Sequence, residues 1–248
     1  LRKKLLMKKR ILVTAGGGFI GSNFLNQSNI LDNFNVVALY RNKIPNKVKG
    51  VEFIKIDLTS FEDCQKLIKG FDLIFHCAGV PMTSAALKEN PYKGLIDNLK
   101  IHTNIIESIK SNPPEKFIWL SSTTGYPDSD KSLSEDEYFC RKVAKRYEIV
   151  GELYRLMESI INKKFNDNCK LITLRPTGVY GEGNDFSPKS SLILAKIIRD
   201  THLNLLPKRI FAQKEEKRNW LYVGDLIKAL DQIIEKVDSS ITLNIGSD

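Results

Sequence analysis

The sequence lacks any long hydrophobic run, any pair of neighbouring cysteines and any cluster of histidines. Without about 18 consecutive apolar residues, no transmembrane helix is expected. Residues 1–9 are basic but too poor in apolar side chains for a secretory signal. Because a predicted strand begins almost directly after Met7, we expect Met7 to be the natural start and residues 1–6 to be an upstream extension.

Cysteine and histidine are too sparse and too scattered to predict disulfides or a metal site. The chain has four cysteines without a close pair and three histidines without the spacing of metal ligands. Such thiols are typical of a reduced, cytoplasmic protein. The sequence therefore predicts a cytoplasmic location and no metal. The residues are Cys64, Cys77, Cys140 and Cys169, together with His76, His102 and His202.

The charge balance is basic, with 38 Lys and Arg against 29 Asp and Glu and a net charge of +9. A nucleic-acid-binding protein would combine such charge with a recognised module or zinc-finger spacing, but these lysines are scattered along the chain. We therefore expect a solvated basic surface that favours anionic small molecules, with neither nucleic acid nor a membrane as partner. The hydrophobic fraction of 42% is sufficient for the core of one domain of moderate size.

Short apolar strands alternate with amphipathic helices along most of the chain. Strands separated by helices predict right-handed crossovers and a doubly wound parallel sheet, the Rossmann-like α/β class. Ligands bind beyond the carboxyl ends of such strands. Strands are expected at 10–14, 35–40, 51–56, 72–76, 116–121, 170–175 and 241–245, and helices at 19–30, 60–69, 92–111, 141–165, 191–199 and 223–236.

The most informative segment is 10–22, where an aliphatic strand leads into a glycine cluster and then into a helix. This order lets backbone N–H groups approach a pyrophosphate at the helix N-terminus. The alternative is an ordinary turn without a ligand. Ala15 stands where the motif usually has its first glycine, and its methyl group resists positive φ, so we expect a slightly altered turn. The dinucleotide-binding residues predicted here are Thr14, Gly16, Gly18, Phe19, Ile20 and Gly21.

The loops after the next three strands supply the other predicted cofactor contacts. Arg41 follows the second strand, where Arg favours the 2′-phosphate of NADP and a carboxylate favours NAD, so NADP is predicted with NAD as the alternative. Asp57 and Leu58 are expected at the adenine, although Asp57 could instead belong to a helix cap. Ala78 and Gly79 are small enough to let the backbone approach the cofactor ribose.

Several segments match, in order, the motifs of one enzyme family. The chain resembles the extended short-chain dehydrogenases/reductases, which are NAD(P)-dependent epimerases and dehydratases of nucleotide sugars. The resemblance spans nearly the whole chain and implies their fold, an NAD(P) cofactor, a nucleotide-sugar substrate and, as an open option, a homodimer. The matching segments are 13–21, 98–107, 117–126, 174–181, 218–225 and 244–247.

The resemblance also implies three catalytic groups. A serine or threonine binds the reacting oxygen, a tyrosine moves a proton, and a lysine four residues later lowers the pKa of the phenol. Ser122 matches the serine. Tyr147 lies at family-like distances from Ser122 and from Arg175, but four residues after it the chain has Gly151 instead of lysine.

Two other alignments of the chain with the tyrosine–lysine motif stay open. Tyr138 and Lys142 match the tyrosine–lysine spacing literally, but Tyr138 follows Ser122 after an unusually short gap. A third register aligns residues 154–158 with a family helix motif and leaves Val150 in the tyrosine position, so that no working dyad would remain.

The resemblance therefore predicts an NAD(P)-dependent epimerase, dehydratase or keto-reductase that transiently moves a hydride on a nucleotide-activated sugar. Arg218 would hold the substrate diphosphate through its planar guanidinium. Gly178 replaces an Asn that many relatives have beside the phosphates. We expect a dinucleotide-binding domain at 7–176 and, at 177–248, a small truncated substrate-binding subdomain interleaved with it. The alternative is a catalytically degenerate dinucleotide-binding protein with a sensor or assembly role.

Overall fold

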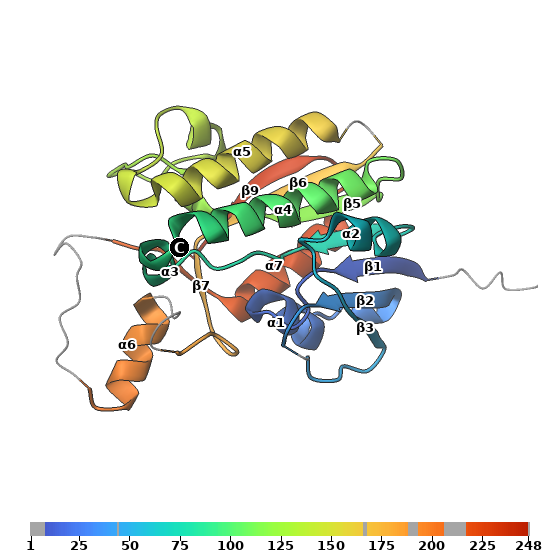
Figure 1. Ribbon diagram of the computed structural model, residues 1–248, viewed down its shortest axis with the longest axis horizontal. Coiled ribbons are helices and arrows are strands. Elements are labelled where there is room, and N and C mark those ends of the chain that lie inside the picture. Colours follow the sequence, from blue (N-terminus) through green and yellow to red (C-terminus); the bar gives the residue numbers. More distant parts are fainter. Residues whose placement is uncertain (1–7, 44, 166–167, 188–192, 206–216, 248) are drawn as a thin grey trace, which may run out of the picture.

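The computed structural model describes residues 8–43, 45–165, 168–187, 193–205 and 217–247, so the expected start at Met7 lies outside it. Its centre is a seven-stranded sheet in the order β3-β2-β1-β4-β5-β6-β9, with every neighbouring pair parallel (Figure 1). The predicted Rossmann-like α/β class is confirmed. The strands are β1 Lys9–Val13, β2 Phe34–Tyr40, β3 Val51–Lys55, β4 Leu73–His76, β5 Lys116–Leu120, β6 Lys170–Pro176 and β9 Ile241–Ile245.

Helices cover both faces of this sheet because strand side chains alternate between two hydrophobic cores. Ile11 and Val13 belong to the core beneath α1 and α7, whereas Leu12 belongs to the core beneath α2, α4 and α5. Within the described ranges, no helix has the length and apolar character needed to cross a membrane. The helices of these layers are α1 Phe19–Gln27, α7 Val223–Lys236, α2 Phe61–Leu67, α4 Pro91–Ile109 and α5 Glu148–Lys164, with the short α3 Ser84–Glu89 before α4.

The structure departs from the sequence prediction mainly at 141–165. The expected helix begins only at Glu148, as α5. Val143 and Ala144 are buried ahead of it, and the Ala144 N–H donates to the carbonyl of Tyr126. Tertiary packing therefore overrides the helical composition of this stretch. Between β5 and α5 the chain makes only short 3-10 turns, at η2 Thr123–Gly125, η3 Glu135–Phe139 and η4 Lys145–Tyr147. Another such turn, η1 Leu31–Asn33, lies between α1 and β2.

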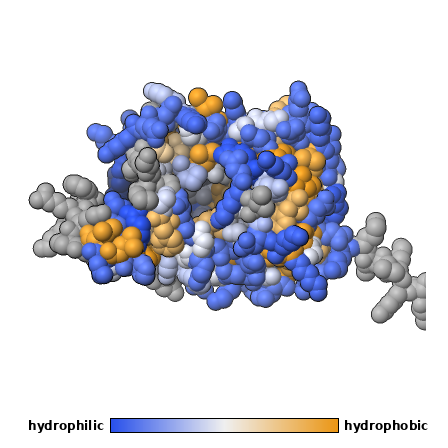
Figure 2. Space-filling view, turned by 60° about the horizontal axis from the view of Figure 1, so that its bottom comes forward, coloured by the Kyte–Doolittle hydropathy of each residue, from blue (hydrophilic) through white to orange (hydrophobic). Residues whose placement is uncertain are grey.

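A smaller unit lies outside the main sheet. β7 (Gly178–Tyr180) pairs in parallel with β8 (Trp220–Tyr222), and α6 (Ile193–His202) stands apart from the main body in Figure 1. The expected helix at 191–199 thus corresponds to α6, although residues 191–192 lie outside the described ranges. Ile198 of α6 and the adjoining Leu203 are exposed. Figure 2 shows an apolar patch at the left edge of the face in view.

A buried ion pair ties α5 to the sheet. Arg175 of β6 pairs with Glu158 of α5 at 2.7 Å, and both side chains are almost wholly buried. The Ser121 hydroxyl donates to the same carboxylate. The Arg175 guanidinium also lies 3.6 Å from the centre of the Tyr138 ring and donates to the Tyr126 hydroxyl at 3.0 Å. One guanidinium therefore anchors both α5 and the segment 126–139 to β6.

Candidate functional site

The glycine-rich turn follows β1 and ends at Gly18, the N-cap of α1, and half-buried Phe19 and Ile20 begin the helix. Ala15 has a φ of +54°, within the left-handed region that favours glycine. Alanine thus adopts the conformation that it was expected to resist, at a cost of roughly 1–2 kcal/mol. Its carbonyl accepts a hydrogen bond from the Gly18 N–H at 2.8 Å, which closes the turn.

The glycines of this turn have two different roles. A Cβ at Gly21 would lie 2.3 Å from the carbonyl oxygen of Ala15, and one at Gly16 would lie 2.8 Å from the Cβ of Ala38. These two positions need glycine because the helix and the strands pack directly together. Gly18 is exposed, and a Cβ there would meet nothing closer than 3.1 Å. The N–H groups of the first helical turn lack intrahelical acceptors, so this open N-terminus can bind a phosphate.

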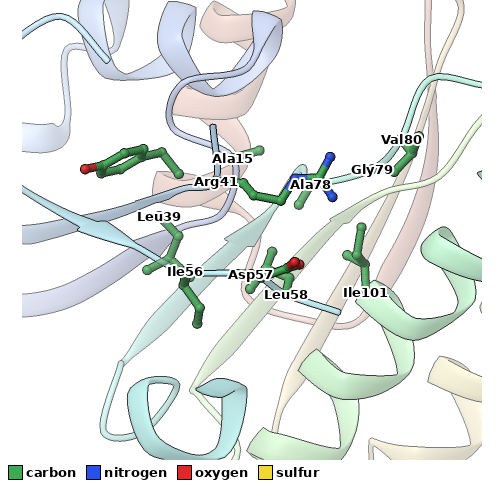
Figure 3. A pocket seen from close by; sticks show the side chains of 11 residues that line it. Ala15, Leu39, Arg41, Ile56, Asp57, Leu58, Ala78, Gly79, Val80 and Ile101 are labelled. Carbon is green, nitrogen blue, oxygen red and sulfur yellow. The ribbon is translucent and has the colours of Figure 1, made fainter. Parts of the chain in front are cut away.

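Beside the turn lies a cavity of about 110 Å³ at the carboxyl-end side of β1–β4 (Figure 3). The structure brings Arg41, Asp57, Leu58, Ala78 and Gly79, all predicted as cofactor contacts, to this one cavity. Sequence reasoning missed the rest of the lining. These are Ala15, Leu39, Tyr40, Ile56 and Val80, which neighbour predicted residues, and Ile101 of α4, which only the tertiary structure brings here.

Two charged side chains of opposite sign lie at this cavity. The Asp57 carboxylate accepts hydrogen bonds from the Thr59 N–H at 3.0 Å and from its hydroxyl at 2.9 Å. The backbone hydrogen bond from Thr59 lowers the pKa of Asp57, and the charge of Arg41 adds a smaller effect in the same direction. The Arg41 side chain is exposed, so an anion at this rim can reach its guanidinium.

Thr14 supports the cavity from behind and does not line it. Its side chain is wholly buried, and its hydroxyl oxygen accepts hydrogen bonds from the N–H groups of Cys77 at 2.9 Å and Ala78 at 3.0 Å. Asn98 of α4 holds the next part of the loop, since it accepts from the Val80 N–H and donates to the Val80 carbonyl. The loop after β4 is therefore fixed by buried polar side chains.

Ser122 follows β5 and is the half-buried N-cap of η2. Its Oγ accepts hydrogen bonds from the N–H of Thr124 at 3.1 Å and from the Thr124 hydroxyl at 2.9 Å. A hydroxyl has one proton and two lone pairs. With both lone pairs engaged, the Ser122 hydroxyl can act on a further group only as a donor, which suits a substrate oxygen.

The literal Tyr138–Lys142 interpretation does not fit the structure. The Tyr138 side chain is wholly buried, and its hydroxyl donates to the Ser122 carbonyl at 3.0 Å. Burial, with a smaller effect of Glu158, raises the pKa of this phenol well above its usual value. Lys142 is exposed and lies beyond the end of η3, so the two residues share no helical face. The structure therefore argues against this pair as a proton-transfer dyad.

Tyr147 lies at a second cavity, of about 390 Å³, near the carboxyl ends of β5, β6 and β9. Hydroxyl and amide groups are frequent in the lining, including Thr123, the neighbour of the predicted serine, and Asn219. Tyr147 is half-buried at the end of η4. The Arg146 guanidinium carbon lies 5.2 Å from its ring centre. The structure thus places Tyr147, and not Tyr138, at an accessible cavity.

α5 carries no lysine at either of the two remaining positions for the catalytic lysine. These positions are 151, if Tyr147 is the tyrosine, and 154, if Val150 occupies the tyrosine position. A Cβ at Gly151 would lie 2.5 Å from the Thr124 carbonyl oxygen, so this turn of α5 packs directly on η2. Tyr154, the position that the third register assigns to lysine, packs against Trp119 of β5. The lysines of α5 lie at its far end, at 163–164. A lysine therefore does not follow the tyrosine position by one helical turn, whether that position is 147 or 150.

The expected substrate residues lie around β7 and β8. Arg218 directly precedes Asn219, whose side-chain oxygen accepts a hydrogen bond from the Thr177 hydroxyl at 2.8 Å. A Cβ at Gly178 would lie 2.7 Å from the Trp220 ring. The indole therefore takes the space that an asparagine at 178 would need.

Comparisons with known proteins agree with this geometry. A profile described as "NAD dependent epimerase/dehydratase family" matches residues 11–246. GDP-L-colitose synthase of Yersinia pseudotuberculosis is 24% identical over 261 residues, which cover 96% of this chain and 77% of that protein.

Solved structures share the fold over most of the chain. UDP-N-acetylglucosamine 4-epimerase of Methanobrevibacter ruminantium, in complex with UDP-N-acetylmuramic acid, matches with a TM-score of 0.81 and 22% identity, covering 97% of this chain and 77% of that one. UDP-glucose 4-epimerase of Thermus thermophilus, in complex with NAD, matches with a TM-score of 0.75 and 22% identity, covering 96% and 78%.

Proposed function

This chain belongs to the NAD dependent epimerase/dehydratase family, and we propose that it binds a nicotinamide dinucleotide after β1 and acts on a nucleotide-activated sugar. The observation that carries the proposal is the open N-terminus of α1 beside a cavity at the point where the strand order reverses, between β1 and β4. The relatives named above are enzymes by name, which favours an enzyme over the non-catalytic alternative.

The residues present fit the dinucleotide. The N–H groups that follow Gly18 would hold the pyrophosphate, Asp57 and Leu58 the adenine, and Ala78 and Gly79 the ribose. When bound, the nicotinamide supplies a centre that accepts and returns a hydride, which is the chemistry that epimerases and dehydratases of this kind require.

The second cavity supplies the groups for the sugar. Tyr147, which lines this cavity, would move the proton. Ser122, the chain neighbour of the lining residue Thr123, would bind the reacting oxygen through its hydroxyl proton, which is free to be donated. Arg218 would hold the diphosphate from the segment beside Asn219. Because α5 places no lysine one turn after Tyr147, we expect base catalysis to be slow and turnover to rise toward alkaline pH.

Turnover is expected to depend on Tyr147 and not on Tyr138. Tyr147→Phe should lower kcat by about 10²-fold or more because it removes the proton that the reaction moves, whereas Tyr138→Phe should mainly lower stability. The measurement is turnover of UDP-, GDP- and dTDP-linked sugars with NAD or NADP across a pH range, with folding checked by circular dichroism. Loss of activity in Tyr138→Phe alone would reverse the assignment, and full activity in both would remove Tyr147 from the mechanism.

Dinucleotide binding itself is tested at Gly18. Gly18→Val should abolish measurable binding because the branched side chain occupies the space that the pyrophosphate needs. Gly18→Ala, the matched control, should weaken binding much less, since it adds a single methyl group, whose close contact with the Ala15 carbonyl oxygen, at 3.1 Å, needs only a small shift of the turn. Calorimetric titration of both variants with NAD and NADP measures the effect. A folded Gly18→Val protein with unchanged affinity would contradict the proposed site.

We expect a preference for NADP over NAD. Arg41 lies at the cavity rim, and a guanidinium binds the 2′-phosphate in a bidentate, charge-assisted manner. Arg41→Ala should weaken NADP binding about tenfold and leave NAD binding within about twofold. Lys47→Ala removes an exposed charge of the same loop and serves as the control for general electrostatics. Tighter binding of NAD by the natural protein, or an equal loss for both cofactors in Arg41→Ala, would argue against the preference.

The proposal also covers the cellular location, the oligomeric state and the division into domains. The four scattered cysteines are free in the structure, in keeping with a reducing, cytoplasmic location. A homodimer is proposed from family resemblance alone. The division at 7–176 and 177–248 is proposed with interleaving, since α7 and β9 from the second segment join the layers of the main sheet while β7, β8 and α6 lie outside it.

A further inference from the structure

A line of three buried polar side chains runs from Thr14, behind the proposed dinucleotide cavity, into α4. Thr14 Oγ1 lies 3.0 Å from His76 Nδ1, and His76 Nε2 lies 2.9 Å from His102 Nδ1. The exposed fractions of the three side chains are 0%, 1% and 2%. The two histidines come from β4 and α4, far apart in the chain, so this contact is a product of the tertiary structure.

The number of donors and acceptors on these three side chains fixes which atom donates in each hydrogen bond of the line. Thr14 Oγ1 accepts from the N–H groups of Cys77 and Ala78, which uses both of its lone pairs. Its proton must therefore be donated to His76 Nδ1. His76 then carries its own proton on Nε2 and donates it to His102 Nδ1. His102 is left with its proton on Nε2, an atom without a hydrogen-bond partner among the described residues.

At its Thr14 end, this line is hydrogen-bonded to the loop that lines the cavity. Cys77 and Ala78 open the loop after β4, and Ala78 and Val80 belong to the cavity wall. One turn before His102 on the same face of α4, Asn98 binds the Val80 backbone directly. α4 thus holds this loop at two places, at Val80 through Asn98 and at Cys77 and Ala78 through the line of three side chains.

We propose that His102 is a positioning residue for dinucleotide binding, because its Nδ1 sets the tautomer of His76 and thereby the hydrogen bonds of the cofactor-binding loop; this rests on the proposed function of the cavity. If position 102 offered no acceptor, His76 Nε2–H would be buried without a partner, which is unfavourable. His76 could avoid this by moving its proton to Nδ1. That N–H would then face Thr14 Oγ1, whose lone pairs are both engaged, and the loop would have to release a backbone N–H.

A matched pair of variants tests the proposal. In His102→Asn the amide oxygen takes the place of Nδ1 and still accepts from His76, whereas His102→Leu has a similar size and no acceptor. Long-range ¹H–¹⁵N NMR spectra of the histidine rings report the His76 tautomer without any cofactor. Calorimetric titration reports the affinity for NAD and NADP. His202→Asn changes an exposed histidine, so it identifies that ring's signals and controls for the loss of a histidine.

We expect Nε2–H at His76 in the natural protein and in His102→Asn. We expect a changed tautomer and a loss of dinucleotide affinity on the order of tenfold in His102→Leu. Nδ1–H at His76 in the natural protein overturns the proposal even if His102→Leu does not fold. Equal affinity losses in both variants also overturn it, because they would indicate packing alone. If the natural protein bound neither cofactor, the proposed function would fail, while the tautomer would still test the hydrogen-bond line.

Discussion

Glu158→Gln is expected to lower the free energy of unfolding by about 3–5 kcal/mol. The substitution keeps the size of the side chain but leaves the Arg175 guanidinium buried without an opposite charge. The same guanidinium binds the Tyr126 hydroxyl and lies over the Tyr138 ring. Loss of its fixed position should therefore loosen the segment 126–139, part of which lines the second cavity, as well as α5. Urea unfolding followed by circular dichroism measures the change.

An exposed ion pair provides the control. Lys170 and Asp238 also form an ion pair, but their side chains are 38% and 78% exposed. Asp238→Asn should therefore cost less than about 1 kcal/mol, because solvent already screens the interaction. In the double variant Glu158→Leu with Arg175→Met, both charges are gone, and it should be more stable than the sum of the two single changes implies. A cost below about 1 kcal/mol for Glu158→Gln would contradict this role of the pair.

Acid is expected to destabilise the protein through the two buried histidines. Burial lowers the pKa of His102 to about 4, and burial together with His102 lowers the pKa of His76 well below its usual value. In the unfolded chain both rings accept protons near pH 6.5. Their stabilising contribution is therefore present above pH 6.5 and is lost as the pH falls from 6.5 toward 4, because only the unfolded chain binds the protons. For His102 alone, the loss approaches about 3 kcal/mol.

The measurement is the free energy of unfolding in urea at several pH values between about 7.5 and 4.5, which span the pH interval over which this contribution is lost. His102→Asn removes one of the two titrating groups while keeping the acceptor for His76, so its stability should fall less steeply with acid. His202→Asn, at an exposed site, should keep the steep dependence of the natural protein. Equal slopes for the natural protein and His102→Asn would show that His102 does not contribute.

The proposed proton-transfer residues show where sequence spacing was not enough. A four-residue spacing places two side chains on one face only when the chain between them is helical. Residues 138–142 are not continuously helical, so the literal match of Tyr138 and Lys142 produces no contact. Burial then distinguishes the tyrosines, since Tyr138 lies in the core and Tyr147 at a cavity. Burial and position therefore favour Tyr147 for the proposed role, which the spacing of Tyr138 and Lys142 alone could not indicate.

The sequence by itself determined the fold class and the place of the cavity beside the glycine-rich turn. Arg41, Asp57 and Ala78 lie far apart in the chain, but each follows a strand of one parallel sheet, and the carboxyl ends of such strands meet at one edge. Their meeting could be predicted because strand order and direction follow from the alternation of strands and helices.

Only the tertiary structure decided which polar groups meet in the interior. Periodicity shows which face of a helix is buried, but not which side chain of another element lies opposite it. The bond between His76 and His102 and the pair of Glu158 with Arg175 both join a strand to a helix. Each depends on how far a helix is shifted and rotated against the sheet, which is fixed by the packing of the whole core and by no local pattern.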